Sequence, residues 1–278
     1  MMHPRFWLKP TFMVAWKDIR ITTRYPSWFV ASFIWPVIFP LTFFFIGRGL
    51  AGPDGQGLSN FSRLADTPDF ASFLIIGNLI WMFVNINLWM GGTSLQQDRM
   101  RGTFDTQWIL PVSKTSLVLG ATIASLILNF IPMVAAIAIY ASLGALTLTG
   151  NFFQILVTII LVFPFLIGFL FTFAAVTLRV RQAFIAVHVM RALLSIFCGL
   201  QFPLAVLPDS VVKIGEVIPL THFVSVLRGI VINRESLGAH TGSLIYLVVS
   251  GAVMFALGWV TFSMVNKNVR RRGLSAGY

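Results

Sequence analysis

Long apolar runs separated by short polar segments dominate the sequence. A helix that crosses a bilayer needs about 20 apolar residues, because the hydrocarbon core is about 30 Å thick. Runs of this kind, with almost no charge, cover residues 27–47, 70–91, 116–146, 152–178, 183–202 and 243–265. The pattern therefore predicts an all-α integral membrane protein with six transmembrane helices. The third run is longer than one crossing requires and contains Pro132, which predicts a kink or a tilt.

The segment before the first run predicts an amphipathic helix over residues 11–24. At helical spacing, apolar side chains fall on one face and cations fall on another. Such a helix lies in the membrane interface, with its tryptophan and basic residues at the level of the lipid headgroups. A plain anchor and a part in transmitting motion both fit this pattern. The apolar face holds Phe12, Ala15, Trp16, Ile19 and Thr23, and the basic face holds Lys17, Arg20 and Arg24.

The stretch between the fifth and sixth runs, residues 198–240, fits neither a span nor a free loop. It is too polar and too rich in proline for one crossing, yet too apolar for an exposed connection. Pro203, Pro208 and Pro219 divide it into short helical units, the last of which carries Arg228. Backbone that enters a membrane without crossing it must be satisfied by protein or water. We therefore expect a re-entrant helical hairpin here.

Composition and charge agree with a membrane protein. The 278 residues are 57% hydrophobic and 10% charged, whereas a soluble domain carries roughly 25% charged residues. Most Lys and Arg residues flank one side of the six-span topology, and the positive-inside rule makes that side cytoplasmic. We therefore expect a multi-pass protein of the cytoplasmic (inner) membrane with both termini in the cytoplasm. The net charge of +11 follows from this topology, so no nucleic-acid partner is expected.

A charged island, QQDRMRGTFDTQWILPVSKTS, separates the second and third runs at residues 96–116. It contains Asp98, Arg99, Arg101, Asp105 and Lys114 in a chain that is otherwise nearly free of charge. Charge alone is compatible with two interpretations. The island is either a loop kept charged for solubility and topology, or a surface that contacts a partner.

Two separated motifs resemble the type-2 permeases of ABC exporters. In the island the matching residues are Asp98-Arg99, Gly102-Thr103, Asp105 and Pro111-Val112-Ser113, with Leu110 where that family commonly has Thr. After the fifth run they are Cys198-Gly199, Phe202-Pro203, Leu207-Pro208, Pro219-Leu220 and Arg228, with Cys198 in place of the usual Ser. The resemblance extends over essentially the whole chain, so residues 1–278 are expected to form one permease domain.

This resemblance implies that the island holds the coupling helix that docks into a cytoplasmic ATPase. Ionised side chains make directional, charge-assisted contacts with a partner. Gly102 allows close approach or a turn, and Pro111 ends the local helix. The expected docking residues are Asp98, Arg99, Arg101, Gly102, Thr103 and Asp105.

The sequence has no G-x-x-x-x-G-K-[ST] phosphate loop, so the chain is not expected to be an enzyme or to hold a cofactor. ATP and Mg²⁺ are expected in the partner ATPase. The resemblance also implies the lipid membrane and a second permease, either an identical copy or a paralogue, as partners in a dimer. The single cysteine, Cys198, and the scattered histidines indicate neither a disulfide framework nor a metal site.

The second run carries a stripe of polar and aromatic residues at helical spacing. An asparagine in hydrocarbon is costly unless it faces protein or water, so the stripe is expected to point inward. It would suit an amphiphilic or drug-like guest. Helix packing with amides as interhelical hydrogen bonds is the alternative, and Asn129 in the third run allows the same two interpretations. The stripe consists of Asn78, Trp81, Met82, Asn85 and Trp89.

The combined prediction is the membrane subunit of an ATP-driven exporter that moves an amphiphilic or drug-like substrate out of the cytoplasm by alternating access. Export of a lipid-linked glycan or polysaccharide by the same machinery is the alternative. A proton-coupled secondary transporter is more remote, because no Asp or Glu lies within the six runs. His188 and Arg191 would suit a proton relay, although an arginine there more often snorkels to the interface. No clustered constellation indicates a membrane-embedded enzyme.

Overall fold

The computed structural model describes residues 5–50, 56–110, 112–177, 180 and 183–272. All regular structure in these segments is helical, and no strand occurs among them. The elements are α1 (Arg5–Thr23), α2 (Pro26–Leu50), α3 (Gln56–Ala65), α4 (Phe70–Met90), α5 (Ser94–Met100), α6 (Phe104–Ile109), α7 (Lys114–Ser142), α8 (Phe152–Thr177), α9 (Ala183–Phe197), η1 (Leu204–Val206), α10 (Asp209–Glu216), α11 (Pro219–Val231), η2 (Leu237–His240) and α12 (Thr241–Arg272).

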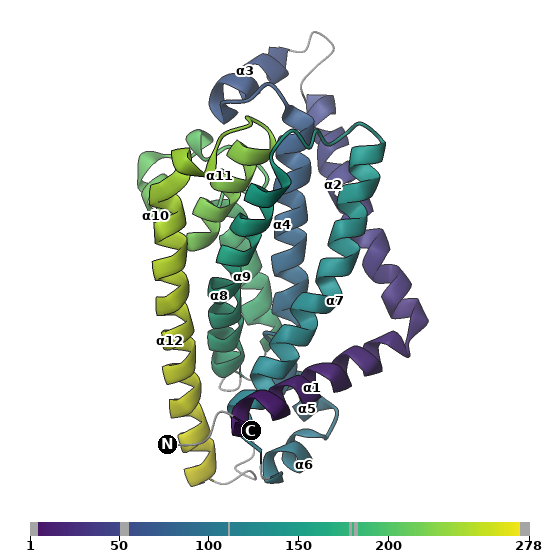
Figure 1. Ribbon diagram of the computed structural model, residues 1–278, viewed down its shortest axis with the longest axis vertical. Helices are drawn as coiled ribbons and strands as arrows, with labels where there is room; N and C mark the ends of the chain where they lie inside the picture. The colour runs from purple at the N-terminus through teal and green to yellow at the C-terminus, as the bar shows by residue number, and fades with distance from the viewer. Residues whose placement is uncertain (1–4, 51–55, 111, 178–179, 181–182, 273–278) are drawn as a thin grey trace.

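Five helices, α2, α4, α7, α8 and α12, are long and apolar enough to cross a membrane. They stand side by side in a bundle, with α5 and α6 at its lower end and α3 at its upper end in Figure 1. The predicted fifth span, 183–202, is shorter than expected, because α9 has 15 residues and ends at Phe197. Gly199 then takes a left-handed φ of +60°, which ends the helix although the sequence stays apolar.

The stretch that was expected to form a hairpin contains two helices joined at a sharp bend. The axes of α10 and α11 meet at 91°, and the pair has the composition of a broken span or a re-entrant loop. Each predicted proline begins a unit: Pro203 precedes η1, Pro208 precedes α10, and Pro219 is the first residue of α11. Proline suits these places because its missing N–H would have no partner inside the helix.

The N-terminal helix α1 begins at Arg5 and lies obliquely across the lower end of the bundle (Figure 1). It packs on α7, where Gly120 leaves room for the backbone of Thr11 and the side chain of Val14. The predicted apolar face is divided between two environments. Ala15 is buried against the protein, whereas Phe12 and Trp16 are exposed, as a helix in a lipid interface requires.

Two apolar cores hold the bundle together. The larger lies between α4, α7, α8, α9 and α11 and includes the fully buried Leu79, Leu170 and Leu200. In addition, α8 and α12 approach backbone to backbone, because Gly168 lies against Phe255 and Gly258 lies against the carbonyl of Gly168. Small residues allow such contact between membrane helices. The smaller core lies at the lower end and supports the charged island.

Candidate functional site

The charged island folds into two short helices, α5 and α6, joined by a tight turn. Gly102 has a φ of +70° and open space around it, so the turn itself requires glycine there. The turn is closed by hydrogen bonds from Thr103 N to Asp98 O at 3.0 Å and from Gly102 N to Arg99 O at 3.1 Å. Pro111 lies outside the described residues.

The inner side of the island is anchored in the protein. Leu95, Phe104 and Trp108 are buried in the smaller core, and the Phe104 and Trp108 rings stack with centroids 4.7 Å apart. Their neighbours come from three spanning helices, so the island is a fixed ledge and not a free loop. These neighbours are Val118 of α7, Phe171, Ala174 and Ala175 of α8, and Phe262 and Val265 of α12.

Lys114 belongs to this anchor. The side chain is buried, and its ammonium donates hydrogen bonds to the carbonyls of Leu110 at 2.8 Å and Gln107 at 3.3 Å. It also lies 5.7 Å from the centre of the Trp108 ring. A cation at this place caps the C-terminal end of α6. Of the charges in the island, Lys114 therefore turns inward and holds the ledge in shape.

The outer side of the island combines charged and apolar side chains. Arg101, Gly102, Thr103 and Asp105 are exposed, whereas Asp98 and Arg99 are partly buried. Asp98 accepts a hydrogen bond from Thr103 Oγ1 at 3.4 Å, and the Arg99 guanidinium lies 5.2 Å from the centre of the Phe104 ring. None of the four charged side chains forms an ion pair with another described residue.

Three exposed apolar residues on this ledge were missed by sequence reasoning. Met100, Ile109 and Leu110 are 58%, 76% and 47% exposed, next to the charged turn. Apolar residues in so hydrophobic a chain give no separate signal, so only the fold reveals that they face outward.

The first helix reaches the same region. Asp18 of α1 pairs with Lys17 at 3.1 Å and lies near Asp98 and Arg101. Burial raises the pKa of the Asp18 carboxyl, and the adjacent Lys17 opposes this rise only in part. The ledge and α1 are thus electrostatic neighbours.

The predicted stripe of α4 faces α2 and α9. Trp81 stacks on Phe39 of α2, with ring centroids 4.8 Å apart. Trp89 lies 5.3 Å from the Phe184 ring and 5.4 Å from the His188 ring, both on α9.

The polar members of the stripe differ in how they are satisfied. Asn78 is fully buried, donates to Leu74 O at 2.9 Å and accepts a hydrogen bond from Gln201 at 3.3 Å. In contrast, the Trp81 Nε1 and Asn85 Oδ1 atoms are buried without a hydrogen-bond partner among the described residues. Met82 is buried and packs within the protein.

Asn129 of α7 serves helix packing. It donates to Ser125 O at 2.7 Å and reaches Asn87 Oδ1 of α4 at 3.4 Å. The amide thus joins two spanning helices, as one of its two interpretations predicted.

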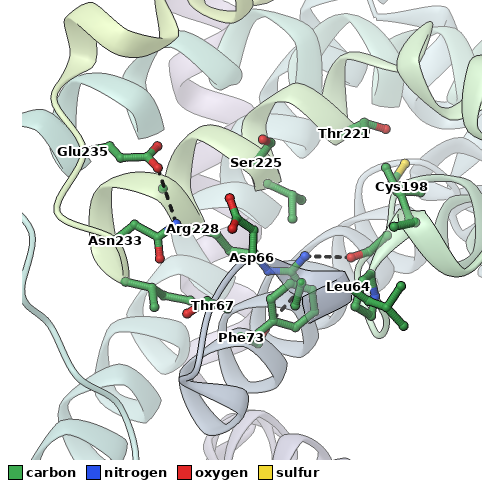
Figure 2. Close-up of a pocket in the computed structure, with 18 of the residues that line it drawn as sticks. Leu64, Asp66, Thr67, Phe73, Cys198, Thr221, Ser225, Arg228, Asn233 and Glu235 are labelled. Atoms are coloured by element: carbon green, nitrogen blue, oxygen red, sulfur yellow. Dashed lines mark hydrogen bonds between the residues drawn. The ribbon is translucent and has the colours of Figure 1, made fainter. Parts of the chain in front are cut away.

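Arg228 of α11 joins three segments at the upper end of the bundle. Its guanidinium donates to Gly199 O and Leu200 O, both at 2.8 Å, and to Phe73 O at 3.1 Å. Gly77 of α4 makes this contact possible, because an added Cβ there would overlap Leu200 O and the Arg228 guanidinium. Figure 2 shows the guanidinium over the Phe73 ring, beside a cavity of about 390 Å³ that Cys198, Asp66 and Glu235 also line.

A second cavity, of about 430 Å³, is lined only by apolar side chains. It lies between α4, α7, α8 and α11, and α4 contributes the face opposite to much of the stripe. No stripe residue lines it. The lining includes Ile80, Phe83, Met133, Ile159 and Phe223.

The sequence model of one protein family, described as ABC-2 family transporter protein, matches residues 53–260. The chain belongs to the ABC-2 transporter family. No curated protein matches the sequence. Membership makes the chain a multi-pass membrane permease subunit of an ABC transporter, which works with a separate ABC ATPase. The match includes α4, the ledge and the bent pair α10–α11.

Proposed function

We propose that this ABC-2 permease is the membrane subunit of an exporter, which moves an amphiphilic or drug-like substrate out of the cytoplasm by alternating access. ATP and Mg²⁺ bind to the partner ATPase. The permease acts as a dimer with an identical copy or a paralogue. The family match supports the transporter class and the ATPase partner, and the features below support the assignments of the docking surface and the substrate path.

The proposed topology has six crossings in the inner membrane. Five are the long helices, and α9 is a short sixth crossing that ends within the bundle beside Asn78 and Gly77 of α4. The bent pair α10–α11 is then the re-entrant hairpin on the outer side. Both chain ends lie in the cytoplasm with the ledge, since α1 and the end of α12 lie at the same end of the bundle as α5 and α6 (Figure 1).

The observation that carries the proposal is the anchored ledge of α5 and α6. Buried aromatic side chains hold it on three spanning helices, while its outer side presents charges without ion pairs next to exposed apolar side chains. A rigid protrusion with such a mixed surface suits a protein partner. We assign docking of the ATPase to Asp98, Arg99, Arg101, Gly102, Thr103 and Asp105, together with Met100, Ile109 and Leu110.

Co-purification tests this assignment. The permease is expressed with the ABC ATPases of its own source organism, and Arg99→Glu with Arg101→Glu is compared with the wild type. The reversed charges are expected to remove the ATPase from the complex while the permease stays folded. The matched control is Arg63→Glu with Arg234→Glu, a double reversal at the opposite end of the bundle. Equal recovery of ATPase in all three proteins would contradict docking at the ledge.

The substrate path is assigned to the α4 stripe of Asn78, Trp81, Met82, Asn85 and Trp89. Its contacts with α2 and α9, and the two unpartnered polar atoms within it, support this assignment. Replacing Trp81 or Asn85 by Ala is expected to change the stimulation of ATP hydrolysis by amphiphiles but not the assembly of the complex. Unchanged stimulation across a panel of amphiphiles would remove the stripe from the path.

A further inference from the structure

Arg191 of α9 lies in the middle of the bundle and not at its end. Trp89 and Phe184 mark the lower ends of α4 and α9, whereas the Arg191 guanidinium lies 5.8 Å from the centre of the Trp81 ring. Trp81 precedes Trp89 by eight residues, which is roughly 12 Å of helix. The hydrocarbon core is about 30 Å thick, so Arg191 lies near the midplane. The guanidinium therefore lies beside Trp81, about two helical turns above the aromatic residues at the lower ends of α4 and α9.

No carboxylate within the membrane can neutralise this cation. All nine Asp and Glu residues of the sequence lie outside α2, α4, α7, α8, α9 and α12. Asp209 and Glu216 belong to α10, which lies beside the upper end of α9, and neither forms an ion pair with Arg191. A second copy of the chain would likewise bring no Asp or Glu residue within these helices. In a dimer of identical chains, the anion that pairs with Arg191 therefore comes from outside the protein.

Arg228 provides an internal comparison. It is also buried in apolar surroundings, but three backbone carbonyls accept its hydrogen bonds. Among the described residues, no acceptor for the Arg191 guanidinium is found. Both terminal nitrogens of Arg228 are thus bound by backbone carbonyls and only its Nε lacks a partner, whereas Arg191 keeps its donors available. A planar guanidinium is well suited to bind a carboxylate, phosphate or sulfate through two parallel hydrogen bonds.

The surroundings of Arg191 are those of a binding site. An anion needs hydrogen-bond donors, and the Trp81 indole N–H and the Asn85 amide NH₂ group supply them one helical turn apart on α4, where the Trp81 Nε1 has no partner among the described residues. Phe39 and Trp89 add aromatic surface on either side. Arg191 is only partly buried and His188, one turn below it, is exposed, so this face is open to a ligand.

We propose that Arg191, with Trp81 and Asn85, binds the anionic group of an amphiphilic substrate near the middle of the membrane. This inference rests on the proposed function, because it names the substrate class for the same path. The chemistry of the ligand is an acidic head on an apolar body. A membrane phospholipid could offer the same chemistry, so the test must separate substrate from lipid.

Direct binding tests the inference without the ATPase. The purified permease is placed in nanodiscs of zwitterionic lipid, and binding of labelled laurate is measured by scintillation proximity, with dodecanol as the uncharged probe of equal chain length. Arg191→Gln is expected to weaken laurate binding by about tenfold or more, which corresponds to the loss of one charge-assisted hydrogen bond. Binding of dodecanol should not change. The laurate affinity of Arg191→Lys, which keeps the charge, should lie between those of the wild type and Arg191→Gln. The laurate affinity of Arg234→Gln should equal that of the wild type.

Two results would overturn the inference, and the second of them distinguishes a bound lipid from a substrate. Equal laurate affinity in the wild type and Arg191→Gln would overturn the inference. The measurement is repeated in nanodiscs that contain anionic phosphatidylglycerol. If the wild type and Arg191→Gln then bind laurate equally at every laurate concentration, Arg191 binds lipid, and this result would also overturn the inference. Where Arg191→Gln is recovered poorly, the comparison of Arg191→Lys with the wild type decides. Failure to recover any ATPase in the co-purification experiment would contradict the proposed function. The laurate measurement does not use the ATPase, so its result would still hold.

Discussion

The Arg228 guanidinium lies over the ring of Phe73, 3.5 Å from its centre, and thereby joins α11 to α4. The same group reaches the carbonyls of Gly199 and Leu200, which follow α9. One side chain therefore fixes α11 to the spanning helix α4 and to the turn that follows α9.

Arg228→Lys is expected to lower the melting temperature of the permease by several degrees. An ammonium cannot span the three carbonyls at once, and each hydrogen bond to a charged group contributes about 1.5–3 kcal/mol. Thermal unfolding in detergent measures the effect, with the exposed Arg234→Lys as the control. A melting temperature equal to that of the wild type would show that the carbonyls find other donors.

Gly77→Ala is expected to displace the turn after α9. The added methyl group would overlap the Leu200 carbonyl and the Arg228 guanidinium, and backbone cannot move aside as a flexible side chain can. Overpacking of this kind costs about 1–3 kcal/mol. Gly242→Ala is the matched control, because nothing lies within 4 Å of its added Cβ. Equal melting temperatures for the two variants would contradict the close contact.

Gly102→Ala is expected to loosen the ledge and to weaken ATPase binding. The left-handed backbone costs an alanine roughly 1–2 kcal/mol, whereas asparagine tolerates it better. Since no atom lies within 4 Å of an added Cβ, the effect arises from φ alone. Hydrogen exchange of amides 99–107 should rise in the order wild type, Gly102→Asn, Gly102→Ala. Any other order would show that the turn is held by its contacts and not by its glycine.

Asp18 is expected to make stability depend on pH. Burial raises its pKa in the folded protein above the unfolded value, so the folded state holds the proton more tightly. Its ionised form therefore destabilises the protein at neutral pH; this penalty begins to shrink as pH falls through the raised pKa and is gone once pH lies below the pKa of the unfolded chain.

Asp18→Asn should accordingly be more stable than the wild type at neutral pH, and the difference should shrink in acid. Melting temperatures of both proteins across this range measure it. A difference in melting temperature between the two proteins that stays constant across this pH range would contradict the rise in the pKa of Asp18.

The spanning helices were largely predictable, because the bilayer forces backbone polar groups to pair within one apolar helix. The predicted run 70–91 corresponds to α4, and 152–178 corresponds to α8, within one residue at each end. The end of α9 was not predictable from apolarity, since residues 198–202 carry no charge and Gln201 is their one strongly polar side chain. The helix stops where Gly199 takes its left-handed φ, and the carbonyls of Gly199 and Leu200 are then bound by Arg228, 28 or 29 residues later.

The residues of the candidate sites were predictable from the sequence, but their arrangement on the folded protein was not. Helical spacing identified the face of α4 that carries Trp81 and Asn85, yet it could not show that α2 and α9 lie against it. Charge identified the island, but Asp98 closes its turn and Lys114 caps α6. The outward position of Ile109 depends on how α6 is seated by Trp108, which is a tertiary contact.

The glycine contacts between α8 and α12 have a mechanical consequence. With no side chains between the two backbones at Gly168 and Gly258, neither helix can slide along the other without a clash. Phe171 and Phe262, on these same helices, also support the ledge from within. A force applied to the ledge would therefore act on α8 and α12 together, over a length of about 40 Å by the 26 residues of α8.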